Sequence, residues 1–442
     1  MLENVKRAAA RGAGVLIVGI SAVPVASAAD KPAIDTGDTA WLLIATALVL
    51  MMNIPGLALF YAGMVRKKNV LATAVQAFAV AALVTVLWFA VGYSLAYTDG
   101  GALNGAIGAL SRTFGSGLQG SVHPLARTVP ENVFLMYQAT FAIITPAIIA
   151  GAFAERMKFS AMMWFMALWV LCVYVPVAHW VWGGGFLGTA GVLDFAGGLV
   201  VHLNAGIAGL ICALILGRRQ GYGHEYMAPH DLVLTLIGTS LLWVGWFGFN
   251  AGSALSSGEL AGYAMLNTHV SAAVAALVWM SIEWASRGKP SVLGILSGAV
   301  AGLGTITPAA GFIEPWAAMV IGLAAGAVCY WSAVILKTQL GYDDSLDAFG
   351  VHGVGGILGM ILTGVFATRA INDVAKGQPV GLVDGHGGQI LTQLYGVVVV
   401  GAFSAIATWI ILKIVDVMIG LRVTRDEETE GLDTALHGER VQ

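Results

Sequence analysis

Two histidines occur in the same short pattern in different halves of the 442-residue chain. His202 begins an H-x3-G-x2-G motif in the stretch DFAGGLVVHLNAG, and His352 begins the same motif in DSLDAFGVHGVGGILG. An aspartate, Asp194 or Asp344, precedes each histidine by eight residues. Two adjacent imidazoles can share one proton, pass it on, or hydrogen-bond a small polar solute. Each histidine could instead be a buried packing residue, but the repeated spacing favours a shared chemical role.

The surroundings of both histidines are those of a membrane protein. Apolar residues make up 58% of the chain and charged residues 11%, against about 25% charged in an ordinary soluble domain. Long apolar runs recur, each near the roughly 20 residues that a helix needs to cross a bilayer. Helices are expected because lipid offers no partner for backbone polar groups, and the 58 glycines suit close helix packing. The sequence therefore predicts an all-α polytopic membrane protein.

Eleven hydrophobic spans are expected, which predicts eleven transmembrane helices. They cover residues 40–64, 71–97, 132–154, 159–180, 195–216, 231–250, 261–285, 292–307, 315–337, 346–367 and 390–419. The tail and the loops on its side carry 13 Lys and Arg, and the opposite loops carry 4. Because Lys and Arg accumulate on the cytoplasmic side, the tail is expected inside and the mature N-terminus outside.

The N-terminal 29 residues have the pattern of a cleavable secretory signal peptide. A basic start is followed by a short apolar core and by an Ala26-Ser27-Ala28 cleavage site. An uncleaved anchor helix is the alternative, and the short core favours cleavage. The predicted organisation is a signal peptide at 1–29, a membrane domain at 30–420 and a cytoplasmic tail at 421–442.

The chain also repeats itself on a larger scale. The stretch FYAG at 60–63 in the first span returns as FNAG at 249–252 in the sixth. Spans 1–5 and 6–10 therefore look like two copies, followed by a long eleventh helix. Each copy has an odd number of spans, so the second enters the membrane from the opposite side, as in many transporters with inverted repeats. Both histidines are then expected to face each other near the middle of the membrane, where ionisable residues are usually functional.

Other candidate residues have ordinary interpretations when each is taken alone. Trp182 could belong to an interfacial aromatic belt or provide a cation–π site. Asp194 could cap the following helix or attract a cation. Ser253 could be a packing hydroxyl. The remaining candidates could belong to the hydrophobic core or to the wall of a transport path; they are Leu57, Phe60, Phe141, Trp246 and Phe249.

Composition limits the other partners of the chain. The net charge of −3 gives no indication of nucleic-acid binding. The three cysteines fall inside apolar runs and have no metal-ligand spacing. We therefore expect no metal and no cofactor.

Six stretches, in order along the chain, resemble the bacterial ammonium transporters of the Amt/Mep/Rh superfamily. They are IPGLALFYAGMVRKKN, AHWVWGGG, DFAGGLVVHLNAG, GWFGFNAGS, FGVHGVGG and GLD…HGE. The resemblance runs from about Trp41 to Glu439, nearly the whole mature chain. It implies a homotrimer in the bacterial inner membrane, with a separate pore in each subunit. It also implies a regulatory tail and a P-II nitrogen-signalling protein that inserts a loop from the cytoplasmic face.

The resemblance also implies roles for individual residues. The outer ammonium site would comprise Trp182, Phe141 and Ser253, with Asp194 beneath it. Phe141 and Phe249 would form a stacked gate, and His202 and His352 would be the twin histidines of the pore. Tyr137 would line the pore wall one turn before the gate, where many members carry phenylalanine, and it adds a hydroxyl near the entrance. The implied mechanism is recruitment of ammonium, loss of its proton, passage of neutral ammonia and separate transfer of the proton.

Three other functions remain open from the residues themselves. A proton-coupled or sodium-coupled symporter for another small solute would keep the inverted repeat but should have a roomier, more polar centre. An intramembrane hydrolase would need a nucleophile or a metal-binding set such as HExxH, and neither is found in the sequence. An ammonium sensor would have to signal through a separate partner, because only a short tail follows the last span.

Overall fold

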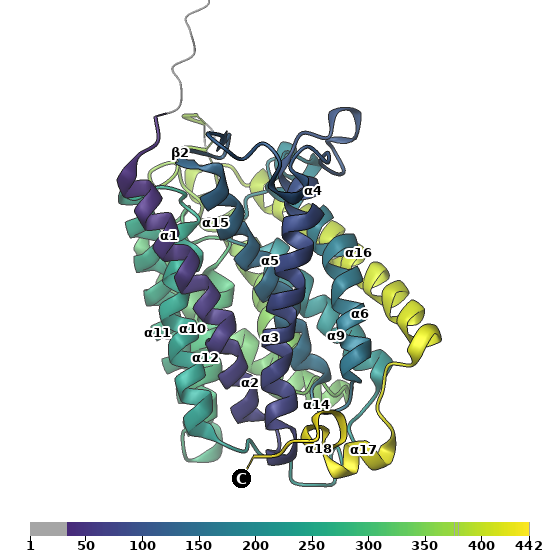
Figure 1. Ribbon diagram of the computed structural model, residues 1–442. Helices are drawn as coiled ribbons and strands as arrows, with labels where there is room; N and C mark the ends of the chain where they lie inside the picture. Colours follow the sequence, from purple (N-terminus) through teal and green to yellow (C-terminus); the bar gives the residue numbers. More distant parts are fainter. Residues whose placement is uncertain (1–32, 375, 379, 442) are drawn as a thin grey trace, which may run out of the picture. The chain divides into compact units, whose positions relative to one another are not determined.

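The computed structural model of the protein describes residues 33–374, 376–378 and 380–441. The signal peptide predicted at 1–29 lies outside these residues. In the unit that begins at Ile34, long helices run side by side (Figure 1). The helices α17 (Arg425–Glu430) and α18 (Leu432–His437) lie at one end of these helices, here called the tail end. Strand β2 (Ala126–Pro130) lies at the opposite end, here called the hairpin end.

The first part of the chain contains α-helices, short π-helical or 3-10 segments labelled η, and one small hairpin. These elements are α1 (Thr36–Met51), η1 (Met52–Leu57), α2 (Ala58–Met64), η2 (Lys67–Asn69), α3 (Val70–Leu87), η3 (Trp88–Gly92), α4 (Tyr93–Tyr97), η4 (Gly101–Leu103), η5 (Thr113–Gly115), β1 (Val122–His123), β2, α5 (Glu131–Phe153), α6 (Phe159–Trp169), η6 (Val170–Tyr174), α7 (Val175–Val181), α8 (Phe186–Thr189), η7 (Gly198–Leu203) and α9 (Asn204–Leu216). The antiparallel pairing of β1 with β2 was not expected from the sequence.

The second part is helical throughout its regular elements. They are α10 (Leu232–Gly252), α11 (Glu259–Arg287), α12 (Val292–Ile306), α13 (Pro315–Tyr330), η8 (Trp331–Leu336), α14 (Lys337–Leu340), η9 (Phe349–Gly353), α15 (Val354–Phe366), η10 (Leu382–Asp384), α16 (Gly388–Ile419), α17 and α18. Several helices begin or end where the sequence supplies a cap. Asp231 accepts the backbone N–H groups of Val233 and Leu234 at the start of α10, and the left-handed Gly288 ends α11.

Ten helical stretches within the described residues are long and apolar enough to cross a membrane. Each of them overlaps one of the predicted spans. The remaining predicted span, 292–307, coincides with α12, an apolar helix of 15 residues. This helix is shorter than the roughly 20 residues of a typical span. The prediction of a polytopic helical membrane protein is confirmed at this level.

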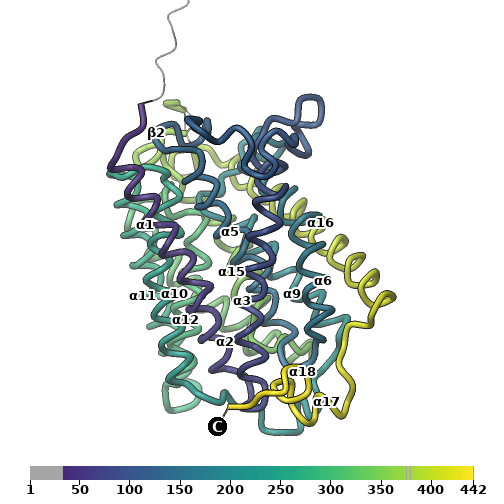
Figure 2. Tube along the Cα trace, in the orientation of Figure 1, coloured from purple at the N-terminus to yellow at the C-terminus, as the bar shows by residue number. Residues whose placement is uncertain are grey.

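Glycines allow the two histidine-bearing segments to cross in contact. A Cβ atom on Gly206 would lie 2.2 Å from the backbone nitrogen of Gly353, and one on Gly356 would lie 2.8 Å from that of Leu203. The segment η7–α9 therefore packs directly on η9–α15. Helix α5, which is almost wholly buried, contacts both α1 and α9, between which it lies in Figure 2.

Candidate functional site

A continuous series of aromatic rings leads to the histidine pair. The rings of Trp182 and Phe141 lie 5.9 Å apart at 88°, and Phe141 stacks on Phe249 at 4.3 Å. Phe249 lies 6.0 Å from His202, and His202 stacks on His352 at 5.2 Å and 11°. The structure thus brings together five of the predicted site residues in the order that the resemblance implies.

The two imidazoles share one short contact. The Nδ1 atoms of His202 and His352 are 3.2 Å apart, so in the neutral pair one ring donates through Nδ1 and the other accepts. The donating ring then carries a bare Nε2 acceptor, and the accepting ring carries an Nε2–H donor. Nε2 of His202 is buried without a partner among the described residues. The pair therefore retains hydrogen-bonding capacity for a small solute.

Small cavities lie on both sides of His352. The first is lined by the predicted residues Leu57, Phe60, Trp246 and Phe249, by both histidines, and by Met52, Ile144, Ile148, Val201, Leu242 and Val300. The second is lined by Phe60, Tyr61, Met64, Ser297, Val300, Leu346, Asp347, Val351 and His352. Each offers about 10 Å³ to the centre of a water-sized sphere, which is close to the room that one small molecule needs.

Two aspartates hold the segments that carry the histidines. The carboxylate of Asp194 accepts the backbone N–H groups of residues 197, 198, 199 and 200 at 2.6–3.3 Å, at the start of η7. Asp344 accepts those of Ala348 and Phe349 at 3.1 and 2.8 Å, at the start of η9. Each carboxylate thus supplies the acceptors that the first turn of a helix needs. The helix-capping interpretation of Asp194 fits these contacts.

Trp182 connects this site to the hairpin end. Its indole N–H donates to the carbonyl oxygen of Asp194 at 2.9 Å, which fixes the half-buried ring. The same residue lines a cavity of about 460 Å³ together with loop residues that include Asp99, Arg112 and Glu131. Trp182, at one end of the ring series, therefore borders a much larger cavity.

Ser253 and Tyr137 both contact the backbone of Phe249. Ser253 Oγ donates to the carbonyl oxygen of Phe249 at 2.8 Å and lies 3.3 Å from the Tyr137 hydroxyl. The Tyr137 ring packs edge-on against Phe141 at 5.1 Å. Tyr137, predicted as pore wall, is absent from the lining of the three cavities just described.

Sequence reasoning missed three residues, on α12 and at its C-terminal cap, that complete the site. A Cβ atom on Gly304 would lie 3.7 and 3.9 Å from the two imidazole Nδ1 atoms, and Thr307 accepts the indole N–H of Trp246 at 2.9 Å. The apolar side chain of Val300 lines both small cavities. None of the three residues belongs to a recognisable sequence motif. Their only common feature in the sequence is their spacing, since Val300, Gly304 and Thr307 are four and three residues apart, as on one face of a helix.

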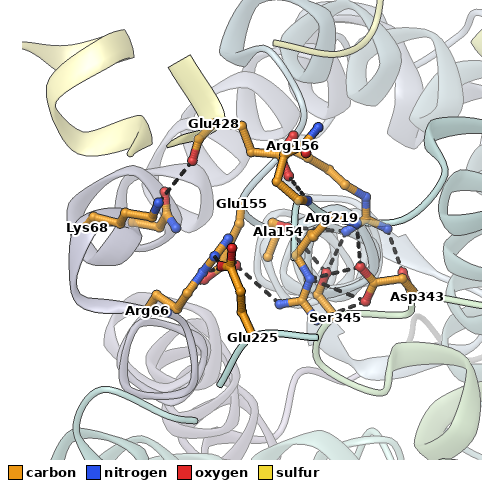
Figure 3. Close-up of polar contacts among 12 residues, drawn as sticks. Arg66, Lys68, Ala154, Glu155, Arg156, Arg219, Glu225, Asp343, Ser345 and Glu428 are labelled. Carbon is orange, nitrogen blue, oxygen red and sulfur yellow. Dashed lines mark hydrogen bonds and ion pairs between the residues drawn. The ribbon is translucent and has the colours of Figure 1, made fainter. Parts of the chain in front are cut away.

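Charged residues form a buried network at the tail end (Figure 3). Glu155 pairs with Arg66 at 2.9 Å and with Arg219 at 3.3 Å, and Arg219 pairs with Asp343 at 2.8 Å. These guanidinium groups hold the pKa values of Glu155 and Asp343 below their usual range despite burial. Arg156, which is fully buried, donates to the carbonyl oxygen of Asp343. The network links three loops with the segment next to Asp344.

The tail is docked onto the same end. Glu428 in α17 accepts from Arg422 at 2.7 Å and from the backbone nitrogen of Gln220 at 2.6 Å. Asp433 in α18 accepts the backbone N–H groups of Leu71 and Ala72 at the start of α3. Because both carboxylates are about 1% exposed, the tail forms part of the folded unit and contacts the loops.

A family comparison and two curated relatives cover nearly the same residues. The sequence model of the Ammonium Transporter Family matches residues 40–442. An ammonium transporter of Bacillus subtilis is 47% identical over 92% of this chain and 98% of its own length. An ammonium transporter of Aquifex aeolicus is 50% identical over 93% of this chain and 95% of its own length.

A solved structure extends the similarity to the fold. The crystal structure of Saccharomyces cerevisiae Mep2 is 38% identical, with a TM-score of 0.83 over 89% of both chains. Sequence and structural similarity therefore both extend over the whole set of helices that carry the ring series.

Proposed function

The chain belongs to the ammonium transporter family, and from this membership we propose that it takes up ammonium beside Trp182 and conducts ammonia past the histidine pair. The observation that carries the proposal is the series of rings from Trp182 to His352. Its first ring, Trp182, lines a large cavity, and its last ring, His352, lines two cavities that each fit about one small molecule. A narrow, largely apolar route fits a very small solute better than it fits the substrate of a symporter.

Ammonium would be recruited at the hairpin end. Trp182 and Phe141 present two aromatic rings, and tryptophan is the best ring for attracting a cation. Ser253 and Asp194 would contribute polar groups near these rings. The Asp194 carboxylate already accepts several backbone N–H groups, so we assign its main effect to holding Trp182 and η7 in place.

The proton would be lost before the gate. A charged ion inside an apolar membrane region is strongly disfavoured, and the stacked rings of Phe141 and Phe249 offer no hydrogen-bond partner. Neutral ammonia can pass more easily. Beyond the gate, ammonia both donates and accepts hydrogen bonds, which matches the one donor and one acceptor that the neutral histidine pair retains at Nε2. The shared Nδ1 contact supports a separate path for the proton.

We also assign the chain an inverted repeat of five spans with α12 as one of eleven membrane helices. Helix contacts support this assignment. The first span packs on the sixth through α1 and α10, and the fifth packs on the tenth through η7–α9 and η9–α15. Asp194 and Asp344 cap equivalent segments in the two halves.

The proposed setting is a homotrimer in the bacterial inner membrane, with the tail cytoplasmic and the mature N-terminus outside. The distribution of Lys and Arg between the loops supports this orientation. The proposed partner is a P-II nitrogen-signalling protein at the tail end. The docked tail supports this partner because it offers a charged surface at the tail end.

The test is the current that ammonium evokes in proteoliposomes. We expect a current with ammonium and none with sodium. His202→Ala should lower it by about tenfold or more, because the remaining buried imidazole loses its partner. His269→Ala is the matched control, since His269 is an exposed histidine on α11 that contacts Trp243 and Phe247.

Two other outcomes would change the proposal. Ammonia uptake without current, seen with a pH-sensitive dye, would indicate a neutral channel and remove the separate proton path. If folded protein gave neither current nor uptake, transport itself would be contradicted and a sensor would be the better reading.

A further inference from the structure

The Tyr137 hydroxyl contacts the backbone of the residue that closes the gate. It lies 2.9 Å from the carbonyl oxygen of Phe249 and 3.0 Å from that of Gly248. The side chain is completely buried on α5. A hydroxyl has a single proton to donate, so it alternates between two carbonyl groups of the same helical turn.

The carbonyl group of Phe249 needs such a donor. Helix α10 ends at Gly252, and the last four carbonyl groups of a helix have no partner within it. The next backbone nitrogen, that of Ser253, donates to Asn250 at 3.1 Å instead. Two hydroxyls, Tyr137 Oη and Ser253 Oγ, therefore cap the carbonyl oxygen of Phe249.

The glycine at position 252 leaves room for the Tyr137 hydroxyl. A Cβ atom on Gly252 would lie 2.6 Å from Tyr137 Oη, which is closer than real Cβ contacts allow. The tyrosine ring meanwhile packs edge-on against Phe141. One side chain thus touches both halves of the gate, the ring of Phe141 and the backbone of Phe249.

We propose that Tyr137 is a positioning residue that fixes the separation of Phe141 and Phe249 and thereby sets the size of solute that passes. The inference rests on the proposed function, because size matters only where a solute crosses the gate. Tyr137 acts through the two phenylalanines, because its hydroxyl contacts the backbone of Phe249 and its ring packs on Phe141. Its loss should admit a larger analogue such as methylammonium.

The experiment compares uptake of ammonium and methylammonium by Tyr137→Phe in proteoliposomes. Losing one neutral hydrogen bond should raise the ratio of methylammonium to ammonium uptake about fivefold. The KM for ammonium should stay within about twofold, because the cation–π rings remain. Tyr174→Phe is the matched control: Tyr174 is also fully buried, and its hydroxyl has no partner among the described residues. It should leave the ratio unchanged.

A second measurement does not depend on transport. Backbone hydrogen exchange in residues 248–256 should be faster in Tyr137→Phe than in the intact protein and unchanged in Tyr174→Phe. Combining Tyr137→Phe with Ser253→Ala should give a non-additive effect on exchange, because both hydroxyls serve one carbonyl group.

Three results would overturn the inference. The first is a raised KM with an unchanged uptake ratio, which would make Tyr137 a ligand. The second is an equal effect of Tyr137→Phe and Tyr174→Phe on the uptake ratio. The third is unchanged hydrogen exchange in residues 248–256. If the intact protein moved neither solute, the transport proposal would fail, and the exchange result alone would decide the positioning role.

Discussion

The hydrogen bond of the Trp182 side chain determines which part of this residue is free to contact a cation. Its N–H group is occupied by the carbonyl oxygen of Asp194, so only the aromatic ring remains available. The edge-on contact with Phe141 keeps two rings at nearly a right angle. Asp194 therefore acts on the site through geometry, by holding Trp182 with its backbone and η7 with its carboxylate.

Replacing this ring should weaken recruitment of ammonium. A cation–π contact contributes about 1 kcal/mol, so Trp182→Leu should raise the KM for ammonium transport about fivefold. Trp180→Leu is the matched control, because Trp180 is also half-buried and donates its N–H to a backbone carbonyl group, that of Ala106. It should leave the KM near that of the intact protein. Equal KM values for the two variants would contradict a recruiting role for Trp182.

Residue chemistry was only partly predictable from the sequence. The histidines could be paired because their motifs repeat, and Asp194 could be suggested as a cap because it precedes a helix. The contact of Tyr137 with Phe249 joins positions that are 112 residues apart, and no local spacing encodes it. Val300, Gly304 and Thr307 escaped notice because residues of this kind on an apolar helix are ordinary packing residues.

At the scale of elements, the meeting of the two histidines depends on the crossing of η7–α9 with η9–α15. The repeated glycines allow the two backbones to come into contact at this crossing. Gly206 meets the backbone of Gly353, and Gly356 meets the backbone of Leu203. A side chain at either glycine would separate the segments and with them the two imidazoles.

Gly206→Ala should therefore abolish most ammonium transport. Its Cβ atom would lie 2.2 Å from the nitrogen and 2.3 Å from the Cα of Gly353. Overpacking of this kind costs about 1–3 kcal/mol of stability, and the thermal unfolding temperature should fall. Gly401→Ala on α16 adds the same methyl group where no atom lies within 4 Å, and it should be neutral. Intact transport by Gly206→Ala would show that the crossing does not set the histidine pair.

Membrane helices were the most predictable elements, because an apolar run long enough for a bilayer has few other uses. Their ends were less predictable. The fifth and tenth spans begin at Gly198 and Phe349, three residues later than expected, since Asp194 and Asp344 reach forward from the preceding loops to cap them. The breaks at η3 and η6 also lie inside runs that look uninterrupted in the sequence, whereas Pro55 marks the break at η1.

Across the whole molecule, the tail end joins segments that are far apart in the chain. Glu428 contacts residues 220 and 422, and Asp433 contacts residues 71 and 72. The buried ion pairs of Glu155 and Asp343 continue from these loops toward the segment that carries His352 (Figure 3). The sequence did not identify these partners, because charged residues in a tail are usually solvated.

The docked tail lies beside the buried charged network (Figure 3). None of the residues lining the second small cavity belongs to 421–441, which is compatible with the proposal that a P-II protein reaches this cavity and uses the tail as part of its docking surface. Loosening the tail should then weaken P-II binding. Glu428→Gln removes the charge that pairs with Arg422 at 2.7 Å in a buried position.

Breaking a buried ion pair is strongly destabilising, so Glu428→Gln should speed hydrogen exchange in residues 421–437 by about tenfold or more. P-II binding to the purified protein should weaken several-fold. Glu430→Gln is the matched control, because it removes the same charge from an exposed position on the same short helix, and both measurements should remain unchanged. Faster exchange with undiminished P-II binding would exclude the tail from the docking surface, and unchanged exchange would mean that Glu428 does not hold the tail in place.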